Sequence, residues 1–500
     1  MTTKKYQTII NENYNLETFE KEINNHYNNL KEEGNYFLLT DSLKIDDDFI
    51  YPYSFDMTKK LLNIGFDYIN TIIAIRDDSK KQDDILTNKF YFVLWFVKNN
   101  DKMYFDKDPI REKHIWKDVE WGKRSKNYHS KGKDPGNVWI PTEDDGKGNI
   151  TEHIIMDKSE VIKRCIISTT RRNDKVLLKS NANPSYSDLE IEVDHETVEY
   201  VPKIRRINKN NNNNKSNKKT NALNANVHFK SSEMMEELNS KSIDLMVTSP
   251  PYWNLKDYYK ENQIGYNESY ENYLDRIKNV LKESYRVLKD KGNMWINIDR
   301  RTKNKKPILM PQDITEISLS LGFKLVDIII WHKSSGIPTH KNNIVRRFEY
   351  FLWFAKDKDF NYYTDNIRDI KDYENNKLNG GNIWNINRKA GSVGKNFVHP
   401  AIYPVKLINR IIKLCTIEKD TVLDPFLGSG TSLISSLINN RNFIGYEYNE
   451  KFHDLIKHRF QKEVVENLDF NLFNNELRNK KFKIDFNFHG NEKKKMNIKR

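Results

Sequence analysis

The sequence predicts an α/β fold in which a doubly wound sheet, covered by helices on both faces, is present twice. Three observations support this prediction. Apolar runs of strand length alternate with helical segments after residue 222, matching segments recur in one order in the two halves, and a stretch without apolar residues, 209–220, lies between them. This Asn- and Lys-rich stretch indicates a linker over 206–222. It divides the chain into 1–205 and 223–465, followed by a basic C-terminal extension at 466–500 that we expect to be frayed at its end.

The elements of the second half follow from hydrophobic periodicity. Apolar residues at helical spacing, including Tyr273, Ile277 and Val280, predict a helix over 270–288. The apolar run 243–248 predicts a buried strand that ends before two prolines. The same reasoning predicts strands at 227–229, 294–298, 325–331, 350–354, 421–423 and 444–447, and helices at 232–239, at 404–415 and after 431. This alternation is typical of a sheet with helices on both sides.

The first half repeats segments of the second. Phe90–Lys98 matches Phe348–Lys356, and Gly34–Asp41 matches Gly292–Asp299 at the same offset. Two later matches keep the order: Gly136-Asn-Val-Trp139 with Gly381-Asn-Ile-Trp384, and His153 with His399, each before a helix. These matches predict a fused duplication of one domain.

The first copy is predicted to be degenerate where chemistry would take place. Leu178, Ala182 and Pro184 align with Asp424, Gly428 and Gly430, so the first copy has no glycine-rich turn. The chain also begins, on this alignment, just past the point equivalent to residues 249–252. We therefore expect an inactive first copy over 1–205 and an active second copy over 223–465.

The composition excludes several classes of protein. Two cysteines, Cys165 and Cys415, rule out a disulfide scaffold and a four-cysteine metal site, and no other metal-ligand spacing is present. No apolar run approaches the ~18 residues of a membrane span, and the polar start lacks a secretory signal. We therefore expect an intracellular protein without a membrane partner. The net charge of +13 indicates a polyanionic partner.

Residues 424–431, Asp-Pro-Phe-Leu-Gly-Ser-Gly-Thr, predict a glycine-rich turn between a strand and a helix. Without Cβ atoms, its glycines allow the backbone to approach a ligand closely, and the helix start offers free N–H groups. Glu447, at the end of the next strand, is suited to a ribose diol. The candidate cofactor-binding residues are Asp424, Pro425, Phe426, Gly428, Ser429, Gly430, Thr431 and Glu447.

The strand 243–248 runs into Ser249-Pro250-Pro251-Tyr252. Two prolines cannot donate to a sheet, so the strand must end there and present its carbonyls. The Ser249 hydroxyl and the Pro250 carbonyl can both accept hydrogen bonds from an amino group, and Tyr252 offers a flat face on which a base can stack. The candidate catalytic residues are Ser249, Pro250, Pro251 and Tyr252.

Together the two motifs resemble those of the exocyclic-amino DNA methyltransferases that use S-adenosylmethionine. The catalytic loop precedes the cofactor loop, as in the β class of that family. Other segments are also similar to the family: 253–258, Gln263-Ile-Gly265, Trp331-His-Lys333, Gly381-Asn-Ile-Trp384, His399-Pro400 and the helix at 404–415. The resemblance covers about 227–462. The sequence departs from the family at Asp299-Arg300-Arg301, where relatives often carry a Gly-Asp pair.

The resemblance implies a Rossmann-like methyltransferase fold, S-adenosylmethionine as cofactor and double-stranded DNA as substrate. Ser-Pro-Pro-Tyr points to the N4 amine of cytosine; the N6 amine of adenine is the alternative, because both loops meet a similar amino group. The base would leave the duplex stack and attack the sulfonium methyl directly. Both cysteines lie in helical runs, which argues against methylation of a ring carbon. The resemblance further implies a cytoplasmic, nucleoid-associated protein in a restriction-modification system, with a companion restriction endonuclease that need not bind it stably.

Three basic stretches, 111–133, 300–306 and 341–347, are candidates for binding DNA phosphates. The candidate DNA-binding residues are Lys123, Arg124, Arg300, Arg301, Arg346 and Arg347. The family places target recognition at about 360–397, which is short here, whereas the equivalent stretch of the first copy is longer and more basic. Because β-class enzymes often pair, we predict a monomer in which the first copy acts as a built-in dimer partner and contacts DNA.

Two other functions are weighed against this one. A DNA-binding regulator that has lost methyl transfer is disfavoured by the intact loops at 249–252 and 428–431. A methyltransferase acting on protein glutamine would carry its cofactor loop first and Asn in place of Ser249, opposite to this sequence.

Overall fold

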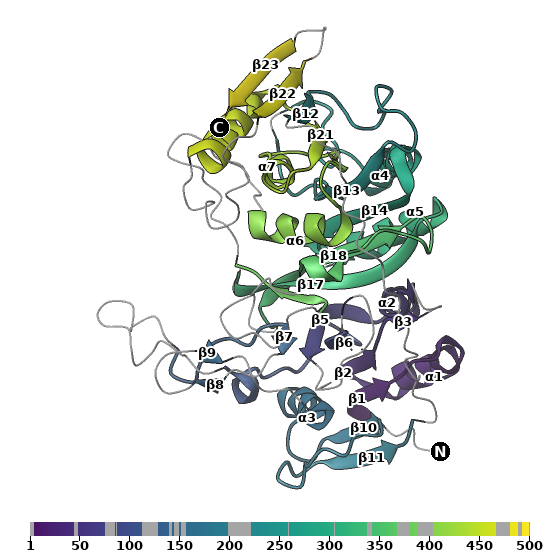
Figure 1. Cartoon of the computed structure of the whole chain (residues 1–500). Coiled ribbons are helices and arrows are strands. Elements are labelled where there is room, and N and C mark those ends of the chain that lie inside the picture. The colour runs from purple at the N-terminus through teal and green to yellow at the C-terminus, as the bar shows by residue number, and fades with distance from the viewer. Residues whose placement is uncertain are drawn as a thin grey trace.

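The structure is a computed structural model. It describes residues 5–44, 49–75, 86, 88–112, 129–139, 143–144, 150–151, 157–198, 222–258, 260–304, 306–337, 343–367, 381–387, 404–466, 481–488 and 493–499. Most of the strand residues among them belong to two large sheets, one in each half of the chain (Figure 1). In Figure 1 the first half lies below the second.

The first sheet has seven strands in the order β11-β10-β1-β2-β6-β5-β7. Its strands are β1 (Tyr6–Glu12), β2 (Leu30–Thr40), β5 (Asp67–Ile75), β6 (Phe90–Val97), β7 (Val138–Trp139), β10 (Lys175–Lys179) and β11 (Glu192–Glu196). The helices of this half are α1 (Leu16–Asn29), α2 (Tyr53–Ile64) and α3 (Lys158–Thr169). Strand β6 is antiparallel to both of its neighbours, and the other pairs are parallel.

The second sheet has ten strands in the order β19-β17-β18-β14-β13-β20-β21-β12-β22-β23. Its strands are β12 (Ala222–His228), β13 (Ile243–Thr248), β14 (Leu288–Ile298), β17 (Lys324–Ile337), β18 (Arg346–Ala355), β19 (Ile383–Asn385), β20 (Thr421–Asp424), β21 (Asn442–Tyr446), β22 (Lys481–Asn487) and β23 (Lys493–Lys499). Its helices are α4 (Tyr270–Val287), α5 (Met310–Ser320), α6 (Val405–Cys415), α7 (Thr431–Ile438) and α8 (His453–Phe460). Short strand pairs complete the fold: β3 (Leu43–Lys44) with β4 (Ile50–Tyr51), β8 (Glu143–Asp144) with β9 (Ile150–Thr151), and β15 (Arg301–Lys303) with β16 (Lys306–Ile308).

The seven strands of the first sheet have counterparts in the same order in the second, from β21 to β19. The agreement extends to side chains. Trp95 Nε1 donates to Asn35 Oδ1 at 2.9 Å, and Trp353 Nε1 donates to Asn293 Oδ1 at 2.8 Å. Gly65 and Gly322, both at positive φ, pack against the hydroxyls of Tyr27 and Tyr285. The predicted α/β fold class is therefore confirmed for both halves.

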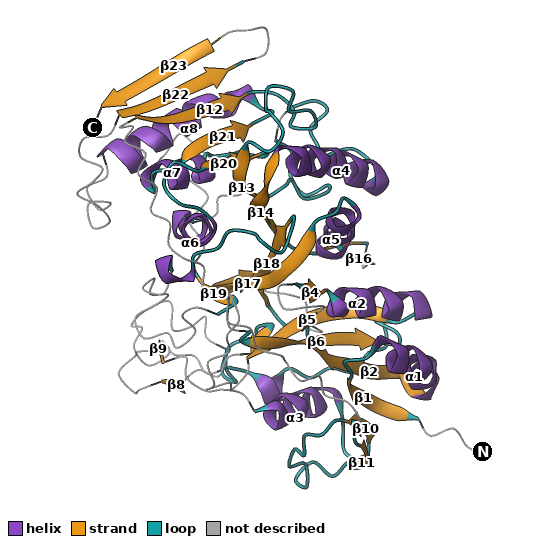
Figure 2. Ribbon diagram, turned by 45° about the vertical axis from the view of Figure 1, so that its right-hand side comes forward, coloured by secondary structure: helices purple, strands orange, loops and turns teal. Residues whose placement is uncertain are grey.

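Helices cover both faces of each sheet (Figure 2), so central strands such as β6 and β13 are buried on both faces, whereas the edge strand β11 is partly exposed. Helices α1, α2, α4 and α5 lie on one side of the molecule, and their apolar residues belong to a single hydrophobic cluster that runs through both halves. Helices α6, α7 and α8 pack on the opposite face of the second sheet, and α3 on that of the first. In α4 the predicted stripe, Tyr273, Ile277 and Val280, is buried.

At the interface between the two halves, equivalent residues of each half pack into the other half. Leu86 of the first half packs into the apolar cluster of the second sheet, and Ile344, its counterpart, packs into that of the first. Likewise β4 lies against β17, and β16 lies against β5. Such exchange is the pattern of an isologous interface, in which each partner presents the same surface to the other.

Three predictions are corrected. Residues 232–239 form turns, not a helix. The C-terminal segment is not frayed over its described residues, because β22 and β23 extend the second sheet beyond β12, and the boundary at 465 therefore cuts through one sheet. The first half does contain a segment equivalent to the catalytic loop. Asn35 pairs with Thr8 as Asn293 pairs with Leu245, so Glu12 and Asn13 occupy the places of Ser249 and Pro250.

Candidate active site

The two predicted loops lie side by side at the carboxyl edge of the second sheet. Strands β13 and β20 are parallel neighbours, so the residues that follow each strand emerge together. Thr248, the last residue of β13, donates a 2.6 Å hydrogen bond from Oγ1 to Asp424, the last residue of β20. The catalytic loop and the glycine-rich loop are thus joined at their first residues.

Asp424 organises the glycine-rich loop from within. It is fully buried and also accepts hydrogen bonds from the Phe426 N–H at 3.0 Å and the Ser432 hydroxyl at 2.5 Å. Gly428 and Gly430 have φ values of 53° and 83°, which glycine adopts without strain. Gly430 is the N-cap of α7. Asp424 therefore shapes the loop, whereas the pocket is lined by the loop residues that follow it.

Glu447 lies directly after β21 and reaches the glycine loop. Its carboxylate accepts the Gly428 N–H at 2.8 Å and the Asn449 N–H at 2.8 Å. Burial raises the pKa of Glu447 to about 7, although these backbone hydrogen bonds favour the charged form. The side chain lines the pocket, so its carboxylate can accept hydrogen bonds from a ligand hydroxyl.

Arg459 is a site residue that the sequence reasoning missed. This α8 residue is fully buried, and its Nη1 donates to the Ser429 carbonyl at 2.8 Å, the Ser429 hydroxyl at 2.7 Å and the Thr431 hydroxyl at 2.9 Å. Glu463 pairs with the other side of the guanidinium at 2.8 Å. Nothing in the local pattern of α8 marks Arg459, because its partners lie about thirty residues earlier in the chain.

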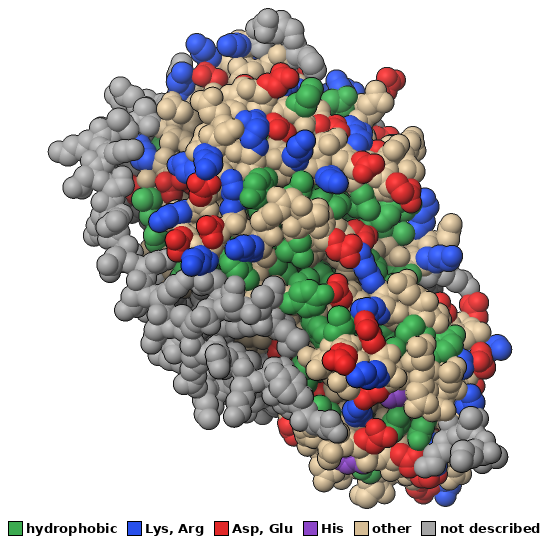
Figure 3. All heavy atoms as spheres, turned by 90° about the vertical axis from the view of Figure 1, so that its right-hand side faces the viewer, with side chains coloured by type: hydrophobic (Ala, Val, Ile, Leu, Met, Phe, Trp, Pro, Cys, Tyr) green, Lys and Arg blue, Asp and Glu red, His purple; other side chains and the backbone are tan. Residues whose placement is uncertain are grey.

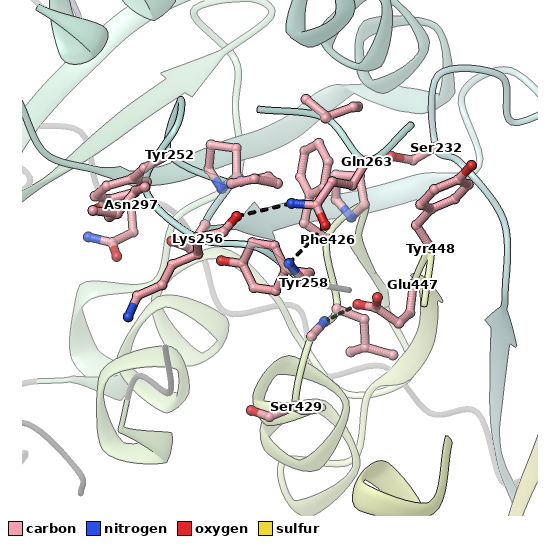
Figure 4. Close-up of a pocket in the computed structure, with 18 of the residues that line it drawn as sticks. Ser232, Tyr252, Lys256, Tyr258, Gln263, Asn297, Phe426, Ser429, Glu447 and Tyr448 are labelled. Carbon is pink, nitrogen blue, oxygen red and sulfur yellow. Dashed lines mark hydrogen bonds between the residues drawn. The ribbon is translucent and has the colours of Figure 1, made fainter. Parts of the chain in front are cut away.

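A pocket of about 770 Å³ connects the two loops (Figure 4). The predicted catalytic and cofactor-binding residues that line it are Ser249, Pro250, Pro251, Tyr252, Pro425, Phe426, Gly428, Ser429, Thr431 and Glu447. The predicted DNA-binding residues that line it are Arg300, Arg301 and Arg346. In Figure 4, Glu447, Tyr448 and Ser232 lie toward one side, which we call the cofactor end, and Tyr252 and Asn297 lie toward the other. Phe426 lies between them.

The end near Tyr252, here called the base end, is lined by polar and charged side chains from three strands. Its members are Asn297, Asp299, Lys333, Arg346 and Glu349. Lys333 is buried and forms an ion pair with Glu349, whose other oxygen lies 3.4 Å from the Tyr252 hydroxyl. Burial raises the pKa of the Asp299 carboxyl. In the sequence, Lys333 belongs to a segment that resembles the family, and Glu349 belongs to a segment repeated in the first half. Neither pattern predicts a role for the residue.

The segment after the catalytic loop closes over the pocket. The Gln263 side chain accepts from the Tyr258 N–H at 2.8 Å and donates to the Lys256 carbonyl at 3.0 Å (Figure 4). Asn449 Nδ2, from the cofactor end, donates to the Tyr258 carbonyl at 2.6 Å. These bonds fix residues 256–258 and 260–263 as one wall of the pocket, and Lys256 belongs to this wall.

The predicted DNA contact of Arg347 is corrected, because its side chain is buried between the two halves, pairs with Glu112 at 2.9 Å and is enclosed by protein. Arg300 is also largely buried and donates to Asn70 at 2.8 Å, but it lines the pocket, so its contact with DNA stays a prediction. Arg346 is partly exposed at the base end, and Arg301 donates to the Trp253 carbonyl. Lys123 and Arg124, and most of the predicted recognition segment 360–397, lie outside the described residues.

The face of the molecule in Figure 3 carries charges of both signs among its described residues. On the face in Figure 3, Lys and Arg side chains are interspersed with Asp and Glu, so the positive charge is not concentrated there. Among the described residues, no cluster of His, Cys, Asp and Glu could hold a metal ion, and no helix is long and apolar enough to cross a bilayer. Cys165 and Cys415 are buried free thiols away from the pocket lining.

The residues of the cofactor end fit S-adenosylmethionine. The glycine loop leaves room beside its backbone, Glu447 can offer carboxylate oxygens to ribose hydroxyls, and the pocket continues from there to the loop at 249–252. A doubly wound sheet with these two loops around one pocket defines an S-adenosylmethionine-dependent methyltransferase. The family comparison specifies it further: the N6/N4 DNA methylase profile matches residues 2–177 and 243–458, and the chain belongs to this family.

Two relatives of known sequence agree with this assignment. The type II methyltransferase M.Cfr9I of Citrobacter freundii is 31% identical over 262 residues, which cover 46% of this chain and 85% of the relative. M.XycI of Xanthomonas campestris pv. cyanopsidis is 32% identical over 260 residues, covering 46% and 84%. Among solved structures, the cytosine-N4-specific PvuII DNA methyltransferase aligns with a TM-score of 0.42 and 19% identity, over 51% of this chain and 93% of that one.

Proposed function

We propose that this DNA methyltransferase transfers a methyl group to the exocyclic N4 amine of cytosine within a specific duplex sequence. The observation that carries the proposal is the shared pocket of Ser249-Pro250 and the glycine loop, held together by the Thr248–Asp424 hydrogen bond. Bound S-adenosylmethionine supplies an electrophilic methyl group on a sulfonium. The residues of the chain then have to bind and orient the amine that accepts it.

The proposed roles follow from the side-chain chemistry. Ser249 Oγ and the Pro250 carbonyl accept the two amine hydrogens and draw the nitrogen toward sp³ character, so that its lone pair becomes available. Tyr252 stacks on the extruded base. Alignment of two reactants held in one pocket supplies most of the rate enhancement. No thiol attack is involved, because burial raises the pKa of both Cys165 and Cys415 and neither lines the pocket.

The choice of cytosine rests on Ser249, since Ser-Pro-Pro-Tyr resembles the cytosine-specific loop and Asp-Pro-Pro-Tyr the adenine-specific one. Adenine N6 methylation is the alternative within the family, because the acceptors at Ser249 and Pro250 suit either amine. Digestion of the methylated DNA to nucleosides and mass spectrometry distinguishes the two. Detection of the N4-methylcytosine nucleoside supports the proposal. Detection of the N6-methyladenine nucleoside in its place supports the adenine alternative.

The first half is proposed to be a degenerate copy that makes the chain an internal pseudo-dimer with one active site. In the place of Ser249 it carries Glu12, a buried carboxylate bonded to Tyr14 at 2.8 Å, Ser180 at 2.6 Å and Lys158 at 2.5 Å. These side chains fill the position where a target amine would be bound. The matching strand order and the exchanged interface contacts support an origin by duplication.

The biological setting is proposed from the relatives. Several are named type II methyltransferases, so a restriction-modification system with a companion endonuclease, acting on DNA in the nucleoid, suits this chain. DNA contacts of Lys123, Arg124, Arg300, Arg301 and Arg346, and target recognition within 360–397, remain part of the proposal. Methylation-aware sequencing of DNA from cells that express the chain, compared with cells that express Ser249→Ala, tests the function. One modified motif that disappears with the variant is expected; unmodified DNA in both would overturn the proposal.

A further inference from the structure

The start of β18 is held from outside its own sheet. Val345, just before the strand, donates its N–H to the Pro135 carbonyl at 2.8 Å and accepts the Asn137 N–H at 2.9 Å. The Asn137 side chain accepts the Arg347 N–H at 2.8 Å. Residues 345–347 are therefore hydrogen-bonded to the first copy, immediately before Phe348 and Glu349, which line the base end of the pocket.

The Arg347 side chain forms a second connection. It donates to Glu112 at 2.9 Å and to the Asp134 carbonyl at 3.0 Å, while the other Glu112 oxygen accepts the Gly136 N–H at 2.9 Å. Arg347 lies directly on Gly136, since a Cβ at Gly136 would be 2.7 Å from Arg347 Cδ. Glu112 thus connects the Arg347 side chain to the backbone of residues 135–137, which binds Val345.

A third connection fixes the neighbouring segment, at the end of β14. Arg300 follows Asp299 of the base end, donates to Asn70 Oδ1 at 2.8 Å and lies over the Tyr68 ring at 4.7 Å. Its carbonyl accepts from Arg346 at 3.0 Å. Two of the segments that carry base-end residues, at 299–300 and at 346–349, are therefore anchored on residues of the first copy.

We propose that Asn70, Glu112 and Asn137 are positioning residues for methyl transfer in the second copy. They hold the base end in place, so the degenerate copy completes the active site across the interface. This inference rests on the proposed function and adds to it a structural role for the first copy. It also gives a reason for the repeated Gly-Asn-x-Trp motif, because the Asn side chain of each motif accepts a backbone N–H of the other copy.

The pseudo-symmetry of the interface supplies a matched control. Asn382, the counterpart of Asn137, accepts the Lys89 N–H at 3.0 Å and so holds β6, the counterpart of β18, in the copy that carries the filled site. Asn137→Ala and Asn382→Ala remove the same kind of contact from the two ends of one interface. Only the first contact supports the pocket that contains Ser249.

The experiment uses the full chain with Asn137→Ala, Asn382→Ala and Glu112→Gln, which keeps the size of the side chain. Methylation kinetics are measured as a function of DNA concentration, and S-adenosylmethionine affinity is measured separately by calorimetry. We expect Asn137→Ala and Glu112→Gln to lower kcat/KM for DNA by about tenfold or more, because small misplacements in an active site cost that much. We expect cofactor affinity in all three variants, and kcat/KM for DNA in Asn382→Ala, to stay within about twofold of the parent.

Hydrogen exchange gives a readout that does not depend on activity. Asn137→Ala should increase amide exchange at residues 345–349, and Asn382→Ala at 88–92. Equal losses of activity in the two Asn variants, or unchanged exchange at 345–349, would overturn the inference. If the parent chain itself transfers no methyl group, the proposed function fails, and the exchange result still decides whether the first copy holds these residues.

Discussion

Arg459 and Ser429 form a buried contact in which one guanidinium nitrogen donates to both the carbonyl and the hydroxyl of Ser429, at 2.8 Å and 2.7 Å. The contact ties α8 to the glycine loop, so the conformation of the cofactor end depends on a helix that follows it in the chain. In the same way, the hydrogen bond from Thr248 to Asp424 connects β13 to the glycine loop. Cofactor binding and target binding are therefore both sensitive to residues outside the two motifs.

Replacing Arg459 should weaken cofactor binding more than it weakens DNA binding. Arg459→Met removes three hydrogen bonds from Ser429 and Thr431 and also the ion pair with the buried Glu463, at a cost of about 3–5 kcal/mol. We expect S-adenosylmethionine affinity by calorimetry to fall at least about tenfold and the thermal midpoint to drop. Arg459→Met with Glu463→Gln should recover the midpoint without recovering affinity; recovery of both would show that the contact matters for folding alone.

The Thr248–Asp424 hydrogen bond can be tested with an isosteric pair. Thr248→Val removes the hydroxyl and leaves an oxygen of a buried carboxylate with one partner fewer, so the free energy of unfolding should fall by about 1–3 kcal/mol. Thr248→Ser, the control, keeps the hydroxyl and should lose much less. Denaturant titration measures both, and equal stabilities for the two variants would argue against this bond as the link between the loops.

Cofactor affinity should rise with pH through neutrality. The pKa of Glu447 is raised to about 7 by burial, and only the charged form accepts two hydroxyl hydrogen bonds. The protonated fraction, high at pH 6, is small at pH 8, so the dissociation constant of S-adenosylmethionine should decrease over this range by roughly tenfold at most. Glu447→Gln should bind weakly at every pH. A parent chain whose affinity is flat between pH 6 and 8 would contradict the assignment.

Ser249→Ala should slow methyl transfer without affecting cofactor binding. The hydroxyl is proposed to accept one amine hydrogen, and loss of one such acceptor costs on the order of 2–4 kcal/mol in the barrier, or roughly 30- to 1000-fold in kcat. Single-turnover transfer of a labelled methyl group measures the effect. Ser231→Ala, at the cofactor end of the same pocket, is the matched control for a lost hydroxyl. A similar fall in kcat for both would count against a specific role of Ser249.

Many elements of the second half could be predicted because the signals for them lie within short stretches of sequence. The periodicity of α4, the proline stop after Thr248 and the glycine turn at 428–430 each lie within a short window of sequence. The helix expected at 232–239 shows the limit of such reasoning, since residues with helical preference there form turns. The sequence alignment of the two copies leaves the first copy without an equivalent of residues 249–252. The register of β1 against β2 instead places Glu12 and Asn13 at the positions of Ser249 and Pro250.

The roles of the arginines could not be predicted from sequence. Arg300 and Arg347 lie in basic stretches like those of DNA-binding surfaces, but a charge pattern does not say which side chains face solvent. Their partners, Asn70 and Glu112, are more than two hundred residues away in the chain. Arg459 was missed for the same reason, because only the packing of α8 against the loop brings it to Ser429.

By itself the sequence determined the fold class, the repeated segments, the two loops and the resemblance to the family, because each of these depends on neighbouring residues or on their spacing. Tertiary structure alone decided that the loops share one pocket, that Glu12 fills the equivalent place in the first copy, and that the first copy holds the start of β18. The physical reason is that hydrogen bonds and burial act between atoms close in space, and such atoms belong here to residues far apart in the chain.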